Sequence, residues 1–162
     1  MKFNRSGYLT PATAIPATLE EIETRLVQEL PDSSTRSYLY TKLRDFLREI
    51  KLLVPGERIE YWIDGSFATL KTNPNDVDIV TFVDYRSFNN HLQSLKTYAE
   101  NYRTLKLPID AYFVADYPED HRLYSRSQAD RAYWVLMFSS TKASYRRKAS
   151  PKEFIKLIID HG

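Results

Sequence analysis

Residues 62–69 read WIDGSFAT and residues 74–80 read PNDVDIV, and these two stretches decide the fold. The first overlaps Arg58–Asp64, a short segment of aromatic and β-branched residues that predicts a strand. Gly65–Ser66 breaks that strand. After a proline-containing loop, residues 76–82 alternate at their start, as a second strand does.

Three carboxylates, two in this region and one on a later predicted strand, are candidate metal ligands. Asp76 and Asp78 are expected on one face, since side chains two residues apart in a strand emerge together. Such close like charges raise one pKa unless a cation lies between them, and all-oxygen ligands suit Mg²⁺ or Mn²⁺. Asp110 supplies a third acid from another predicted strand, Ile109–Val114. The set would suit a two-metal phosphoryl-transfer site, in which the ions lie about 3.5–4 Å apart.

The turn at Gly65–Ser66 is the candidate phosphate-binding element. Glycine permits close backbone approach to a triphosphate, and the Ser66 hydroxyl can donate to a phosphate oxygen. Taken singly, an Asp-x-Asp strand or a Gly-Ser turn is common in proteins without such a site. Their combination with Asp110, in this order, favours the functional interpretation. Asp64 is expected to orient the turn rather than to bind metal.

Composition describes an ordinary globular protein. The 162 residues are 43% hydrophobic and 27% charged, which suits one domain. A net charge of +2 does not argue for nucleic-acid binding, and four glycines cannot build a glycine-rich phosphate loop. The absence of cysteine excludes disulfides, a thiol nucleophile and thiolate zinc sites. Without a signal-peptide pattern or an apolar run near the roughly 20 residues that span a bilayer, we expect a cytoplasmic protein and no membrane contact.

The remaining segments predict one α+β domain over residues 1–162, a mixed sheet flanked by helices. Residues 1–17 form an extended arm, and residues 18–54 form two helices, the first capped at Thr18 and the second beginning near Ser33. The catalytic core spans 58–115 and includes a helix over residues 87–103. A C-terminal extension follows at 116–162.

Within the extension, periodicity is weaker. Asp116 to Arg131 is polar and predicts a long loop, whereas Tyr133 to Phe138 fits either a strand or a buried helix. Ser150 and Glu153 match a capping box with Pro151 at the first helical position. This pattern predicts a closing helix through residue 159.

The segment from Trp62 to Val80 resembles the signature of the nucleotidyltransferase superfamily: a hydrophobic residue, Gly-Ser, a spacer, then Asp-hydrophobic-Asp, with a later acid on a strand. More narrowly, Trp62–Thr69 and Pro74–Asp78 resemble the W-[IL]-D-G-S-F-x-T and P-x-D-[IV]-D segments of the bacterial DUF6932 family. The resemblance implies a nucleotidyltransferase-like fold of the polymerase beta type.

The resemblance also implies roles for individual residues. Gly65 and Ser66 would contact the nucleotide phosphates, Asp76 and Asp78 would bind Mg²⁺ or Mn²⁺, and Asp110 would complete the metal-binding triad and activate an acceptor hydroxyl. The chain would then move a nucleoside monophosphate from an NTP to a hydroxyl on RNA or protein. Small members of the superfamily imply a toxin–antitoxin or phage-defence setting with a cognate toxin or antitoxin partner. The alternative is a non-catalytic antitoxin or adaptor module that retains the fold and binds a partner protein.

One departure concerns positive charge near the phosphates. Many small superfamily members carry Arg-Gly shortly after Gly-Ser, where this chain has Phe67 to Lys71. Lys71 supplies the missing charge or is a solvated loop lysine. Arg146 and Arg147 lie in the densest basic cluster, which also contains Tyr145 and either binds nucleotide or RNA or is an exposed charged stretch.

Overall fold

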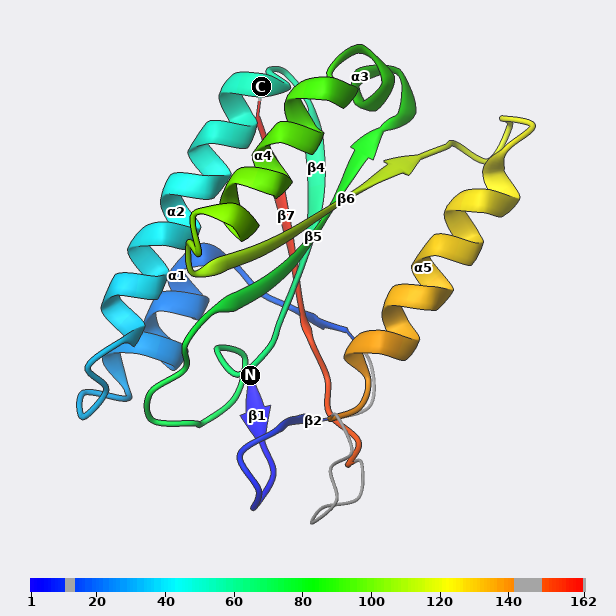
Figure 1. Ribbon diagram of the computed structural model, residues 1–162. Coiled ribbons are helices and arrows are strands. Elements are labelled where there is room, and N and C mark those ends of the chain that lie inside the picture. Colours follow the sequence, from blue (N-terminus) through cyan, green and yellow to red (C-terminus); the bar gives the residue numbers. More distant parts are fainter. Residues whose placement is uncertain (11–13, 142–149, 162) are drawn as a thin grey trace.

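The computed structural model describes residues 1–10, 14–141 and 150–161, and its centre is a five-stranded mixed sheet (Figure 1). In sheet order the strands are β3 (Ile15–Pro16), β7 (Ile155–Asp160), β4 (Arg58–Asp64), β5 (Val77–Asp84) and β6 (Ile109–Asp116). β4 runs antiparallel to both of its neighbours, whereas β5 is parallel to β6 and β3 to β7. The predicted α+β class, a mixed sheet flanked by helices, is confirmed.

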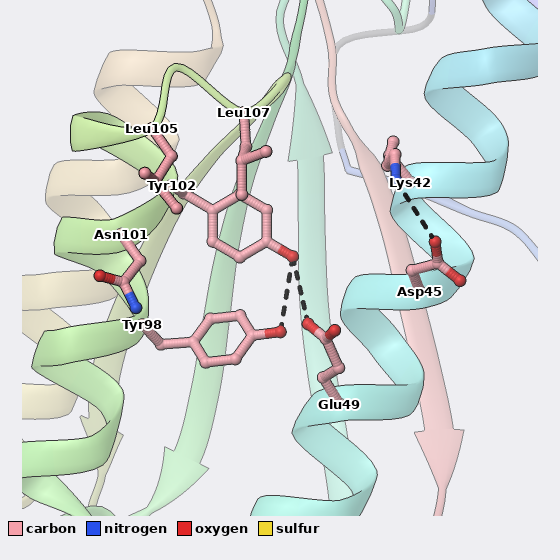
Figure 2. A pocket seen from close by; sticks show the side chains of 8 residues that line it. All are labelled: Lys42, Asp45, Glu49, Tyr98, Asn101, Tyr102, Leu105 and Leu107. Carbon is pink, nitrogen blue, oxygen red and sulfur yellow. Dashed lines mark hydrogen bonds and ion pairs between the residues drawn. The ribbon is translucent and has the colours of Figure 1, made fainter.

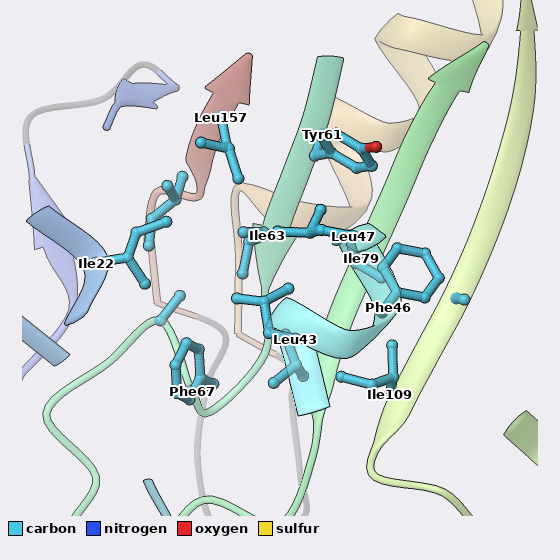
Figure 3. Close-up of a cluster of buried hydrophobic side chains, with 14 of the residues drawn as sticks. Ile22, Leu43, Phe46, Leu47, Tyr61, Ile63, Phe67, Ile79, Ile109 and Leu157 are labelled. Carbon is cyan, nitrogen blue, oxygen red and sulfur yellow. The ribbon is translucent and has the colours of Figure 1, made fainter. Parts of the chain in front are cut away.

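One face of the sheet is covered by α1 (Leu19–Glu23), the π-helical turn η1 (Thr24–Gln28), α2 (Arg36–Leu53) and α4 (Leu92–Thr104). Leu43, Phe46 and Leu47 of α2 pack there against buried strand side chains (Figure 3). The strand residues of this larger core include Ile59, Tyr61, Ile63, Val77, Ile79, Ile109, Ala111, Ile155 and Leu157.

The opposite face is covered by α5 (Tyr124–Phe138), which lies apart from the other helices in Figure 1. Trp134 and Phe138 of α5 pack against alternate strand residues, including Trp62, Val80 and Phe82. Because side chains alternate along a strand, this face also receives the aspartates of β4, β5 and β6. α5 therefore lies on the face that carries the candidate site.

Two N-terminal helices are present as predicted, but the first passes from α1 into the π-helical turn η1, and the second begins at Arg36 rather than near Ser33. Thr18 caps α1, and Glu21 completes the capping box. The predicted single helix over residues 87–103 is instead two helices, α3 (Tyr85–Asn90) and α4, which meet at His91. Asp84 caps α3 by accepting from the Arg86 backbone N–H at 2.9 Å.

The prediction of a long loop from Asp116 to Arg131 is wrong, because α5 begins at Tyr124. The helix covers only part of one sheet face, so the buried stripe along it is narrow. Ser127 and Phe138 are its buried residues. Its other positions are polar or exposed, so helical periodicity is weak there. The uncertain stretch 133–138 is the last part of this helix.

The predicted closing helix is also wrong, since residues 155–160 form β7 in the interior of the sheet. β7 pairs with β4 along six residues, which satisfies the hydrogen-bonding groups on that side of β4. Ile155 and Leu157 alternate with Lys156 toward opposite faces, which is strand rather than helix periodicity. The Ser150 N–H donates to the Thr141 hydroxyl at 2.9 Å instead of opening a helix.

The N-terminal arm is extended as predicted, but it is folded against the domain. β1 (Lys2–Phe3) and β2 (Leu9–Thr10) form a hairpin close to the end of β4 (Figure 1). The Leu70 N–H donates to the Gly7 carbonyl at 2.9 Å, so the hairpin is attached to the loop that follows Gly65–Ser66. Across the described part of the chain, no helix is long and apolar enough to cross a membrane.

Candidate active site

Three aspartates lie side by side on three neighbouring strands. Asp64, the last residue of β4, is in register with Asp78 of β5, and Asp78 is in register with Asp110 of β6. Residues directly opposite in a ladder point to the same face and interact. We call Asp64, Asp78 and Asp110 the acid row. Asp76 precedes β5 instead of lying within it as predicted, because pairing with β6 begins at Val77.

Among the described residues, the positive charge near the acid row does not offset its burial and mutual repulsion. Burial raises the pKa of Asp78 to about 6, and the charges of Asp76, Asp64 and Asp110 add to this effect, opposed by Lys152. Asp64 is only 4% exposed, and burial raises its pKa although Lys152 contacts its carboxylate. A second cation at this position would therefore be favoured electrostatically.

A pocket of about 1020 Å³, which we call the acid pocket, contains the acid row. All sequence-predicted site residues that fall within the described ranges line it: Gly65, Ser66, Lys71, Asp76, Asp78 and Asp110. Sequence positions far apart are thus brought together, and the loop lysine Lys71 faces the same space as the acids. The predicted residues Arg146 and Arg147 lie outside the residues that the structure describes.

Gly65 is required by the geometry of this site. Its φ of +79° lies in the left-handed region that favours glycine. A side chain at Gly65 would also collide with the carboxylate of Asp78. The strand end, the turn and the central carboxylate therefore depend on one another.

Arg36 of α2 fixes the loop after Gly65–Ser66 by hydrogen bonds to its backbone carbonyls. Arg36 is 1% exposed, and its guanidinium donates to the carbonyls of Phe67 at 2.9 Å, Thr69 at 2.5 Å and Lys71 at 2.6 Å. Burial lowers the pKa of Arg36 to about 10. An arginine distant in sequence thus supports the loop that follows Gly65–Ser66.

Among the side chains that line the acid pocket, Lys152, Arg5 and Tyr112 are polar groups that the sequence analysis did not assign to the site. Lys152 was read as part of a helix start, and Arg5 as part of a featureless arm, so nothing in the pattern assigned them. Tyr112 did have a signal, since it lies two residues after Asp110 on the same strand face. Its hydroxyl donates to Asp110 Oδ2 at 2.7 Å.

The donor set fits a hard divalent cation in chemistry, since its carboxylates are clustered and the charge of Lys152 does not offset the raised pKa of Asp78. In the part of the chain that the structure describes, no group of three His, Cys, Asp or Glu side chains is arranged to hold a metal ion. Asp64 and Asp110 each direct an oxygen to a protein donor, Lys152 and Tyr112 respectively. Metal binding would require these carboxylates to turn.

The family comparison agrees with the narrower sequence resemblance. A family model described as "Family of unknown function (DUF6932)" matches residues 1–158. The chain belongs to the DUF6932 family. No curated protein and no solved structure matches it.

A smaller hollow of the DUF6932 protein, about 240 Å³, lies between α2 and α4 (Figure 2). Tyr102 donates to Glu49 Oε2 at 3.3 Å there, and Lys42 approaches Asp45 at 3.8 Å. The Tyr102–Glu49 contact joins α4 to α2, the Lys42–Asp45 contact lies within α2, and none of the residues that line this hollow lines the acid pocket. We interpret this hollow as part of the helix packing.

Proposed function

We propose that this protein is a metal-dependent nucleotidyltransferase that moves a nucleoside monophosphate from an NTP to an acceptor hydroxyl. The observation that carries the proposal is the in-register acid row within a pocket that Gly65 and Ser66 also line. Clustered carboxylates with raised pKa values in a pocket are typical of functional sites. The fold is proposed to be of the nucleotidyltransferase type for the same reason.

In this proposal, Asp76, Asp78 and Asp110 would hold Mg²⁺ or Mn²⁺. The metal would neutralise phosphate charge and polarise the reacting phosphoryl group. Ser66 and the Gly65 backbone face the triphosphate, while Lys71 and Lys152 add positive charge from the pocket lining.

The proposed transfer step moves one proton and breaks one bond. The acceptor hydroxyl oxygen bonds to the α-phosphorus, the bond from that phosphorus to pyrophosphate breaks, and Asp110 accepts the hydroxyl proton. Tyr112 positions Asp110 through its hydrogen bond to Oδ2. Holding both reactants in line accounts for much of such a catalyst's effect.

The test is incubation with labelled NTPs, Mg²⁺ or Mn²⁺ and candidate RNA and protein acceptors. Asp76→Ala with Asp78→Ala is expected to abolish labelling while circular dichroism shows a folded chain. Asp116→Ala is the matched acidic control, because Asp116 lies on the same sheet face but outside the acid pocket. Equal labelling by wild type and the double variant would refute the proposal.

A second candidate function is a non-catalytic antitoxin or adaptor that binds a partner protein. The observation that favours it is the exposed apolar surface of α5, where Tyr133 is 53%, Leu136 73% and Met137 47% exposed. Met137 also lines the acid pocket, so a partner seated there would cover the pocket mouth. Calorimetry with a non-hydrolysable ATP analogue and Mg²⁺ separates the two: absence of binding at millimolar ligand favours the adaptor.

A further inference from the structure

Asp76 and Asp110 lie where two hollows meet. A second hollow, about 580 Å³, shares Asn75, Asp76, Asp110 and Tyr112 with the acid pocket. Its other lining residues come from the end of α4 and the segment leading into β6. Asp110 is therefore accessible from two directions, one past Gly65–Ser66 and one past the turn between α4 and β6.

The turn between α4 and β6 brings two cations to the second hollow. Arg103 and Lys106 both line it, and both are exposed. Among the residues described, neither side chain has a hydrogen bond or ion pair to the protein. We call this second space the basic hollow.

The backbone holds the turn in place. Lys106 has a φ of +51°, which is uncommon for a residue other than glycine. The Leu107 N–H donates to the Tyr102 carbonyl at 2.9 Å, and the Tyr102 side chain is 8% exposed and belongs to the larger core. The two cations are thus carried by a turn fixed to the packed part of the domain.

We propose that the basic hollow binds the acceptor, and that this acceptor carries a phosphate group, as a nucleotide or a nucleic-acid strand does. The acceptor role rests on the proposed function, in which the NTP occupies the acid pocket. A phosphate approaching Asp76 and Asp110 is repelled unless cations lie beside its path, and Arg103 and Lys106 lie there. A neutral protein hydroxyl has no need of them.

The chemistry of the hollow also fits such an acceptor. A guanidinium matches the planar geometry of two phosphate oxygens, and an ammonium binds phosphate as a point charge. Tyr112 adds an aromatic ring on which a base can stack beside the reacting carboxylate. Both hollows would then meet at the atom that accepts the proton, Asp110 Oδ.

The experiment measures binding of a short fluorescein-labelled single-stranded oligoribonucleotide by fluorescence polarisation. Arg103→Gln with Lys106→Gln is expected to raise the Kd at least about tenfold and to reduce the salt dependence of log K by about 1.5. Arg44→Gln with Lys51→Gln, which removes one arginine and one lysine charge from exposed positions on α2, is expected to leave the Kd within about twofold.

Competition with AMP identifies which phosphate-bearing ligand the hollow takes. Displacement by AMP assigns a mononucleotide, and displacement by unlabelled RNA alone assigns a polynucleotide.

Three results would overturn the inference: no RNA binding by the wild type, equal weakening in both double variants, or labelling of a protein acceptor that is unchanged in the Arg103/Lys106 variant. Its failure is distinguishable from that of the proposed function. If a non-hydrolysable ATP analogue does not bind but RNA binds through Arg103 and Lys106, transfer is refuted and the basic hollow stands as a nucleic-acid site. If transfer occurs and the double substitution changes neither RNA binding nor the acceptor KM, only the inference fails.

Discussion

One face of the sheet carries two clusters of carboxylates, and they differ in how far cations balance them. At one end, Glu60 accepts from Arg131 at 2.8 Å, Lys156 at 3.0 Å and the Trp62 indole at 2.6 Å, and Asp116 accepts from Arg131 at 2.8 Å. Burial alone would raise the pKa of Glu60, but Lys156 and Arg131 outweigh it and the pKa is lowered. We call Glu60, Asp116, Arg131 and Lys156 the balanced cluster.

At the other end of this face, the carboxylates of the acid row are less fully balanced by cations. Burial and the charges of Asp76, Asp64 and Asp110 raise the pKa of Asp78, and Lys152 opposes this rise. Both clusters come from the same strands, since β4 carries Glu60 and Asp64 and β6 carries Asp116 and Asp110. The fold therefore neutralises carboxylates on this face where their task is structural. The unbalanced end is where a ligand would supply the missing charge.

Breaking the balanced cluster should have the largest effect on stability. Arg131→Met is expected to lower the free energy of unfolding by about 2–3 kcal/mol, because Glu60 and Asp116 both lose their shared partner. Removing one member of a fully buried pair costs about 3–5 kcal/mol, and the loss is smaller here because 29% of the Arg131 side chain is exposed. Urea unfolding at neutral pH measures it.

The control for this substitution is Arg126→Met on the same helix. Arg126 is 68% exposed and approaches Asp130 only at 4.0 Å. Its loss should change the free energy of unfolding by no more than about 0.5 kcal/mol. Equal losses for Arg126→Met and Arg131→Met would contradict the distinction between balanced and solvated charges.

Neutralising Asp78, at the centre of the acid row, should raise the free energy of unfolding rather than lower it. Asp78→Asn removes a charge that burial and three neighbouring aspartates disfavour, so we expect the free energy of unfolding at pH 7 to rise by about 1–2 kcal/mol. The same variant should lose transfer activity. Asp116→Asn, in the balanced cluster, should destabilise the protein. A destabilised Asp78→Asn variant would show that the acid row is stabilising in itself.

The gain from Asp78→Asn should depend on pH. The pKa of Asp78 is raised from an ordinary value of 3.8 to about 6, so the folded chain binds this proton more tightly than the unfolded chain does. That contribution to stability is fully present below about pH 4 and is lost as the pH rises through about 6. The difference in free energy of unfolding between variant and wild type should therefore be near zero at about pH 4 and complete, at about 1–2 kcal/mol, by about pH 7. A difference that is constant across this range would contradict the cause assigned to the raised pKa.

Local sequence pattern predicted the acid end of the sheet well because its signals lie within single elements. Arg58–Asp64 is a strand with the predicted bounds, and Gly65 and Asp78 line one pocket. The register between β4, β5 and β6 places Asp64 in the acid row, but register depends on pairing between strands, which the pattern of one strand does not specify.

The balanced cluster was not predictable in the same way. Its central residue, Arg131, fell in a segment read as loop, because α5 buries only a narrow stripe and shows little periodicity. Lys156 lies on β7, which was read as a helix from a Ser-Pro-x-Glu pattern that the chain does not use as a cap. Both errors concern elements whose conformation is decided by what they pack against rather than by local preference.

The smallest effect we expect is stabilisation by metal, and it tests whether the unbalanced charge of the acid row is a metal site. Mg²⁺ at about five times its Kd would raise the free energy of unfolding by about 1 kcal/mol, or about 2–4 °C in melting temperature. Asp78→Asn should abolish this shift, whereas Asp116→Asn, which changes the same charge in the balanced cluster, should retain it. An equal shift in both variants would indicate general screening by salt. No shift in the wild type at millimolar Mg²⁺ or Mn²⁺, with an NTP analogue present, would mean that the acid row does not bind a divalent cation.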